Sequence, residues 1–352
     1  MNMDITFRWY GKDDPVSLEY IRQIPAVRGI VSALYDVPVG EEWPRERIAA
    51  LRKTIESAGL RFLCIESIPV HEDIKLGRKT RDRLIDAYCA SVENMGAEGV
   101  PVLCYNFMPV FDWTRSDLAM KHQDGSTSLS YDHDALAKID LREGTFDLPG
   151  WATRYSADEL KGLLDAYTSV DDEALWKNLE YFLKRVVPAA EKAGVVMAIH
   201  PDDPPWPIFG LPRIITGEAS LDRLLGLVDS RANGLTFCTG SFGPNAGMDL
   251  VRCIRKYGNL GRVHFVHLRN IKRTGEFSFH ETAHPTECGD VDMYGAVRAL
   301  VDTGFRGIVR PDHGRMIWGE TGRPGYGLYD RALGAMYILG LYEAAVKDGE
   351  TK

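Results

Sequence analysis

The chain has 352 residues, of which 45% are hydrophobic and 26% charged, a composition typical of a globular protein with a large core. Its formal net charge of −8 comes without a basic cluster. We therefore do not expect the protein to bind a nucleic acid, because neutralising a phosphate backbone requires clustered Lys and Arg.

Eight short runs rich in Val, Ile, Leu and Phe recur along the chain. They predict strands at residues 5–9, 29–35, 62–67, 99–107, 195–201, 234–240, 262–268 and 307–313. Amphipathic patterns predict helices at residues 44–58, 79–95, 172–193, 219–229, 248–257, 291–303 and 328–347. Strands that alternate with helices favour a parallel sheet, and eight such strands close a barrel. We expect an α/β protein, a single (β/α)₈ TIM barrel domain that spans residues 1–352.

Residues 108–171, after the fourth strand, show no sustained hydrophobic period. Inserts of this length in a barrel are usually loops or lids over the site. We therefore expect this segment to cover the pocket, with Trp113 closing over a bound substrate.

The six cysteines lie far apart and form no CxxC pair, a distribution typical of a reducing compartment. The first residues, MNMDITFRWYG, do not resemble a signal peptide, and no apolar run approaches about 18 residues. We expect a cytoplasmic protein that neither spans nor binds a membrane.

Four consecutive predicted strands end in metal-ligand residue types. The fifth ends in His200, the sixth carries Cys238, the seventh carries His267 and the eighth ends in Asp312. Neighbouring strands of a barrel bring their carboxyl ends together, where active sites of this fold lie. Each residue alone would more often be a packing residue, but imidazole, thiolate and carboxylate at four successive ends predict a metal site.

His264 is an alternative to His267 as a ligand, since only three residues separate the two in HFVHLRN. The odd spacing places them on opposite faces of an ideal strand, and His267 lies nearer the carboxyl end. We therefore choose His267 and expect His264 to pack in the core or behind the ligands.

Other strand ends carry groups suited to binding a carboxylate substrate. Arg8 lies at the end of the first strand and Asn106 at the end of the fourth, while RPDHGRM sets Arg310 and Arg315 around Asp312. Arginine binds carboxylates through two hydrogen bonds, so these cations favour an acidic substrate. The alternative for each arginine is a salt bridge at the surface or the barrel rim.

Several common cofactor and hydrolase motifs are missing. The segment TGSFGPNAG lacks the GxGxxG spacing, and neither GxxxxGK[ST] nor GxSxG occurs. Dinucleotide, P-loop and serine-hydrolase functions are therefore disfavoured.

Long segments of the chain resemble the mannonate dehydratases, a family within the xylose-isomerase-like barrels. The segments are FRWYGKDD, CYNFMPVFDWTR, IHPDDPP, FCTGSFG, HFVHLRN, RPDHGR and PGYGLYDRALG. The resemblance implies a lyase that removes water from D-mannonate to give 2-keto-3-deoxy-D-gluconate in hexuronate breakdown. It also implies Mn(II) or Fe(II) on His200, Cys238, His267 and Asp312, whereas ligand softness alone would suggest Zn(II).

The same resemblance implies an acid and a base at His313 and Tyr326, with Tyr329 as the near alternative to Tyr326. Which of the pair is the base stays open at this point. His313 is next to Asp312, and adjacent residues of a strand point to opposite faces, so His313 needs a loop turn to reach the pocket.

Two other functions remain possible. A sugar isomerase or epimerase on this barrel would also use a metal and a proton shuttle, but it would form no 2-keto-3-deoxy acid. A barrel that only binds sugar acids would bind ligand without turnover. The apolar last helix, ALGAMYILGLYEAAV, leads us to expect a homodimer.

Overall fold

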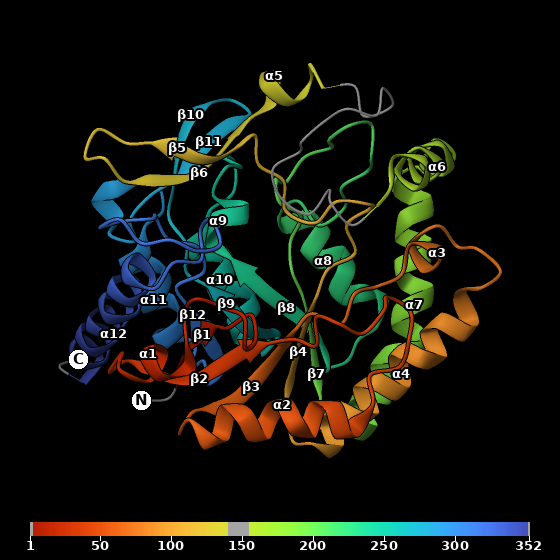
Figure 1. Cartoon of the computed structure of the whole chain (residues 1–352), viewed down its shortest axis with the longest axis horizontal. Helices are drawn as coiled ribbons and strands as arrows, with labels where there is room; N and C mark the ends of the chain where they lie inside the picture. Colours follow the sequence, from red (N-terminus) through yellow and green to blue (C-terminus); the bar gives the residue numbers. More distant parts are fainter. Residues whose placement is uncertain (1–2, 140–154, 351–352) are drawn as a thin grey trace.

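The computed structural model describes residues 3–139 and 155–350, and within them eight parallel strands close into a barrel (Figure 1). In chain order the strands are β1 (Asp4–Arg8), β2 (Val27–Ser32), β3 (Arg61–Glu66), β4 (Val102–Tyr105), β7 (Val196–Ile199), β8 (Asn233–Cys238), β9 (Val263–His267) and β12 (Ile308–Arg310). Each strand pairs with the next, and β12 closes the barrel on β1. All eight predicted strands are confirmed. Several are shorter than predicted because the ladder stops where the loops of the pocket begin.

The predicted helices surround the barrel. They are α2 (Arg45–Ser57), α4 (Arg81–Ala97), α7 (Asp172–Ala193), α8 (Glu218–Leu227), α10 (Leu250–Asn259), α11 (Met293–Asp302) and α12 (Tyr329–Glu350). The ends of α7 follow the local chemistry of the sequence. The Asp171 carboxylate accepts a hydrogen bond from the Ala174 N–H, and Gly194 ends the helix at a φ of 69°. Short helices α1 (Leu18–Arg22), α3 (Glu72–Lys75) and α9 (Thr239–Phe242) were not predicted.

Side chains fill the barrel, so the fold encloses a packed core instead of a channel. The interior cluster consists of Val31, Cys64, Val102, Cys104, Ala198, Phe265 and Ile308. A larger apolar layer lies between the strands and the helices. Cys64 and Cys104 thus serve as small hydrophobic residues, and burial raises the pKa of both thiols.

A second, antiparallel sheet lies beyond one end of the barrel (Figure 1). Its order is β10-β11-β6-β5, with β5 (Asp117–Lys121), β6 (Thr127–Asp132), β10 (Ile271–Gly275) and β11 (Ser278–Glu281). Strands β5 and β6 belong to the predicted insert, and β10 and β11 follow β9. The central pairing of β6 with β11 therefore joins two loops that lie more than a hundred residues apart in the chain.

The insert is more regular than its sequence indicated, since it also forms α5 (His133–Leu136) and α6 (Ala157–Tyr167). Its strands are too short to show a period in the sequence. Residues 140–154 of the insert lie outside the described residues. A lid function for the insert stays a prediction.

No helix within residues 3–139 and 155–350 combines the length and the apolar character that crossing a membrane requires.

Candidate active site

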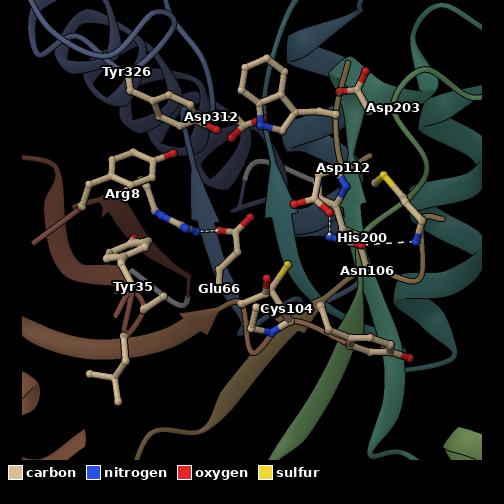
Figure 2. Close-up of a pocket in the computed structure, with 18 of the residues that line it drawn as sticks. Arg8, Tyr35, Glu66, Cys104, Asn106, Asp112, His200, Asp203, Asp312 and Tyr326 are labelled. Carbon is tan, nitrogen blue, oxygen red and sulfur yellow. Dashed lines mark hydrogen bonds and ion pairs between the residues drawn. The ribbon is translucent and has the colours of Figure 1, made fainter. Parts of the chain in front are cut away.

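A pocket opens at the carboxyl ends of the barrel strands, where the sequence predicted the site (Figure 2). Its lining includes Arg8, Glu66, Asn106, Trp113, His200, Asp203, Arg269, Arg310, Asp312, His313 and Tyr326. Most of these residues end a barrel strand or follow it by one to three positions. Figure 2 shows Arg8 and Glu66 pointing toward each other on one side of the pocket, opposite His200.

Three of the four predicted metal ligands converge. The ligand atoms of His200, Cys238 and His267 all lie within 4.8 Å of one another. The register explains part of this, because Cys238 and His267 are direct partners at the ends of β8 and β9. His200 Nε2 lies 3.2 Å from His267 Nδ1. Two nitrogens bound to one ion at about 2.0–2.1 Å with tetrahedral angles are separated by about 3.3 Å, so the spacing fits.

Asp312, the fourth predicted ligand, borders this group. Its Oδ2 lies 3.6 Å from His267 Nδ1 and 3.4 Å from Arg269 Nη1, and Arg310 donates to its Oδ1. Burial opposes ionisation of Asp312, but its electrostatic interactions with His313, Arg310 and other nearby side chains hold its pKa well below the ordinary value. The carboxylate is therefore ionised, the form that a cation binds.

The two histidines differ in protonation when no ion is bound. Burial and the charge of Arg310 lower the pKa of His267, so its ring is neutral. Desolvation would lower the pKa of His200 too, but its hydrogen bond with Cys238 and the charge there raise it to about 9, so an ion bound at Nε2 would replace a proton. His200 Nδ1 donates to the Pro201 carbonyl at 2.7 Å, which leaves Nε2 facing the group, as in many metal sites. The residues present therefore fit a divalent ion.

A second set of donor atoms, from Glu66, Cys104 and His267, lies beside the first. Arg310 donates to both oxygens of Glu66, at 2.5 and 3.2 Å, and Arg8 Nη1 lies 2.8 Å from Oε2. Burial keeps Cys104 protonated, because it raises the pKa of the thiol. Two guanidinium groups and a neutral thiol disfavour a cation here, so the first group is the candidate metal centre.

His313 and Tyr326, predicted as the acid and base, are in contact. The His313 Nε2 lies 2.8 Å from the Tyr326 hydroxyl, and the two rings meet edge to face with centroids 4.7 Å apart. β12 ends at Arg310, so the irregular backbone that follows allows His313 to enter the pocket beside Asp312. Burial raises the pKa of Tyr326. Tyr329 is 42% exposed and packs on Trp318 at the start of α12, away from His313.

A buried charge network behind His313 was missed in the sequence. Arg115 Nη1 lies 2.7 Å from Asp203 and its Nη2 lies 2.8 Å from Glu281. Arg269 Nη2 lies 2.6 Å from Asp203, and Glu281 Oε1 lies 2.7 Å from His313 Nδ1. Asp203 stands in IHPDDPP beside a predicted ligand, which was a usable signal. Arg115 ends CYNFMPVFDWTR but stands beside no predicted ligand, and Glu281 lies in none of the quoted segments.

The whole chain matches one known family. A model of the D-mannonate dehydratase (UxuA) family matches residues 3–352. The chain belongs to the D-mannonate dehydratase family. Mannonate dehydratase of Streptococcus uberis is 59% identical over 345 residues, which cover 98% of this chain and 99% of that protein. Mannonate dehydratase of Streptococcus agalactiae serotype V is 58% identical over the same length.

Solved structures agree with this assignment. The crystal structure of mannonate dehydratase from Streptococcus suis serotype 2 superposes with a TM-score of 0.92 at 52% identity, covering 99% of this chain and 96% of that one. An L-ribulose 3-epimerase superposes with a TM-score of 0.54 at 15% identity, covering 99% of this chain and 97% of that one. The epimerase shares the barrel fold with the dehydratase family, and the likeness supports nothing further.

Of the five residues predicted to bind substrate, four line the pocket and Arg315 does not. Arg8, Asn106 and Trp113 line the pocket. Arg310 also lines it, but its guanidinium is held by Glu66 and Asp312. Arg315 is not among the pocket residues, because its Nη2 pairs with Asp330 at 3.0 Å and its Nη1 with Asp124 at 2.9 Å.

His264 lies apart from the metal group of the dehydratase pocket. Its Nε2 bonds the Arg231 carbonyl at 2.8 Å, and burial lowers its pKa to about 4. It is therefore a neutral core histidine on β9, as its opposite face on the strand predicted.

Proposed function

We propose that this protein dehydrates D-mannonate to 2-keto-3-deoxy-D-gluconate and water in hexuronate breakdown. Family membership over the whole chain supports the substrate and the reaction. The observation that carries the chemistry is the contact of His313 with Tyr326 beside Asp312 in the pocket. An acid, a base and a group of possible metal ligands then adjoin one sugar-acid site.

We also propose that His200, Cys238, His267 and Asp312 hold the ion, and that it is Mn(II) or Fe(II), as the family resemblance implies. The support is the short spacing of the donor atoms, together with the neutral His267 and the ionised Asp312. A bound divalent ion would supply Lewis acidity, which stabilises negative charge on the oxygens of the substrate.

The reaction removes a proton from C2, next to the carboxylate, and the hydroxyl from C3. The His313 Nε2 accepts the C2 proton, and the Tyr326 hydroxyl donates its proton to the departing C3 hydroxyl, which leaves as water. Tyr326 suits the acid role because burial raises its pKa and keeps the phenol protonated. The enol that forms gains a proton at C3, which His313 can return, and gives up the proton of its C2 hydroxyl, which restores Tyr326. The product is the keto acid.

The remaining pocket groups orient the sugar acid. The guanidinium of Arg8 faces the pocket with its charge only partly balanced by Glu66, which it shares with Arg310. It is therefore suited to bind the substrate carboxylate. Trp113 lies edge-on to His313, with centroids 5.4 Å apart, and limits the access of water to the base.

The proposed reaction is tested with chelator-treated protein, several aldonic acids, and Mn(II), Fe(II), Mg(II) or Zn(II) added back separately. A 2-keto-3-deoxy acid forms only on dehydration, so its detection excludes an isomerase, an epimerase or a barrel that only binds. If no ion restores dehydration of mannonate, the proposal falls. His313→Asn should lose turnover and keep its metal content; near wild-type turnover would reject His313.

We propose a homodimer that forms through an apolar face of α12. Tyr329, Leu333 and Met336 are 42%, 50% and 40% exposed at helical spacing, and Trp318 beside them is 74% exposed. Leu333→Glu should shift the sedimentation coefficient toward a monomer. An unchanged coefficient would place the contact elsewhere.

We further propose that the protein works in the cytoplasm. Cys64, Cys104, Cys238 and Cys253 are buried free thiols, which persist in a reducing compartment. Fractionation of the source cells, with immunodetection of the protein, tests this location.

A further inference from the structure

We propose that Glu281 is a positioning residue for this reaction. Its carboxylate fixes the ring and the proton of His313, so that the basic nitrogen of His313 faces Tyr326 and the substrate. This inference rests on the proposed dehydratase function. It assigns a role in the reaction to the small sheet, which lies outside the barrel.

A continuous line of contacts supports the proposal. Glu281 Oε1 lies 2.7 Å from His313 Nδ1, and His313 Nε2 lies 2.8 Å from the Tyr326 hydroxyl. Glu281 and His313 are 1% and 2% exposed, so water does not compete for these contacts. Glu281 is absent from the lining of the pocket, whereas His313 and Tyr326 are part of it. Glu281 therefore does not touch a substrate in the pocket itself, and it contacts the proposed base, His313, directly.

Two side chains contact Nδ1 of His313, and they favour different tautomers of its ring. Glu281 Oε1 can only accept a hydrogen bond from Nδ1, whereas Arg269 Nη1, 2.9 Å from Nδ1, can only donate one to Nδ1. A carboxylate oxygen 2.7 Å from a bare nitrogen lone pair would be repelled, whereas Arg269 has other acceptors. Its Nη2 donates to Asp203 at 2.6 Å, and its Nη1 lies 3.4 Å from Asp312 Oδ2. Of the two tautomers, the one with the proton on Nδ1 therefore fits these contacts, and it leaves the lone pair on Nε2, toward Tyr326.

The charge and position of Glu281 are themselves fixed. Arg115 Nη2 donates to Glu281 Oε1 at 2.8 Å, and Arg269 Nη1 lies 3.3 Å from the same atom. Although burial opposes ionisation, His313, Arg269 and Arg115 hold the pKa of Glu281 below its ordinary value. The backbone is anchored as well, because β11 lies between β10 and β6 in the sheet. A carboxylate held this firmly can orient an imidazole, as a buried Asp does in serine proteases.

Glu281→Gln tests the inference, because the amide keeps the size of the side chain but can donate to Nδ1 and favour the other tautomer. We expect kcat to fall by about 10²- to 10⁴-fold, the range for losing the correct tautomer of a catalytic base. KM should change less than about threefold and metal content should stay at wild type, because Glu281 touches neither substrate nor the ligand group. Glu281→Asp keeps the charge, so it should recover part of the lost kcat.

His280→Gln is the matched control. His280 precedes Glu281 on β11, is partly buried, and stacks edge to face with His122 instead of His313. Its kcat should stay within about twofold of wild type. An equal loss in this variant would show that any disturbance of β11 lowers activity, and it would overturn the specific role of Glu281.

A double-mutant cycle with His313→Asn separates positioning from general support of the fold. If Glu281 acts through His313, adding Glu281→Gln to His313→Asn should lower kcat less than about threefold further. Multiplicative losses, or a Glu281→Gln enzyme with near wild-type kcat, would overturn the proposal. If Glu281→Gln does not fold, the cycle is run with Glu281→Asp and read by the same criteria. A wild-type protein that leaves mannonate unchanged would instead refute the proposed function.

Discussion

Tyr326→Phe removes one hydroxyl from the pocket and nothing else. The loss in folding free energy should be small, about 0.5–1.5 kcal/mol for one hydrogen bond to His313. The ring contacts remain, since the phenyl group still meets Tyr10 edge to face with centroids 4.9 Å apart. Loss of a general acid costs about 10²- to 10⁴-fold in rate, which is about 3–5 kcal/mol in the barrier. Activity should therefore fall far more than stability.

Formation of the 2-keto-3-deoxy acid measures kcat, and urea unfolding measures the folding free energy. Tyr329→Phe is the control, because Tyr329 is the same residue type three positions later and does not contact His313. We expect its kcat to match wild type. Equal kcat in the wild type and Tyr326→Phe, or an equally large loss in Tyr329→Phe, would refute the role of Tyr326.

Three further predictions concern metal binding and stability. Cys238→Ser should lower metal affinity at least about tenfold, because a hydroxyl does not ionise at neutral pH; metal titration of the purified variant measures this. Arg115→Met should destabilise the fold by about 3–5 kcal/mol in urea, because Asp203 and Glu281 lose a buried partner. His264 has a pKa of about 4 when folded, against an ordinary 6.5, so the unfolded chain binds more protons between these values. Stability present above pH 6.5 should therefore decline toward pH 4, and His264→Gln should flatten that slope; an unchanged slope would contradict the assignment.

The barrel was predictable because its strands are buried on both faces and appear as apolar runs, with helices of clear period between them. The cluster of possible metal ligands was predictable for a related reason. Neighbouring strand ends must converge in a closed barrel, so His200, Cys238 and His267 could be brought together without any contact information. The distance between the residues in the sequence did not matter.

The charge network could not be predicted in this way. Glu281 lies on a four-residue strand and Arg115 lies in an insert without a period. Their proximity depends on the pairing of β6 with β11, which no local pattern encodes. Arg315, which was predicted to bind substrate but lies outside the pocket lining, shows the same limit. Its partner Asp330 becomes its neighbour only through the loop that precedes α12.

The pairing of β6 with β11 also constrains how this protein could be altered. The two loops are halves of one sheet, so replacing the loop after β4 alone would leave β11 with an open edge facing solvent. Such an edge invites association between copies, and Glu281 at its end would lose its support. Redesign of the loops at the carboxyl end of this barrel therefore requires exchanging the loops after β4 and β9 together.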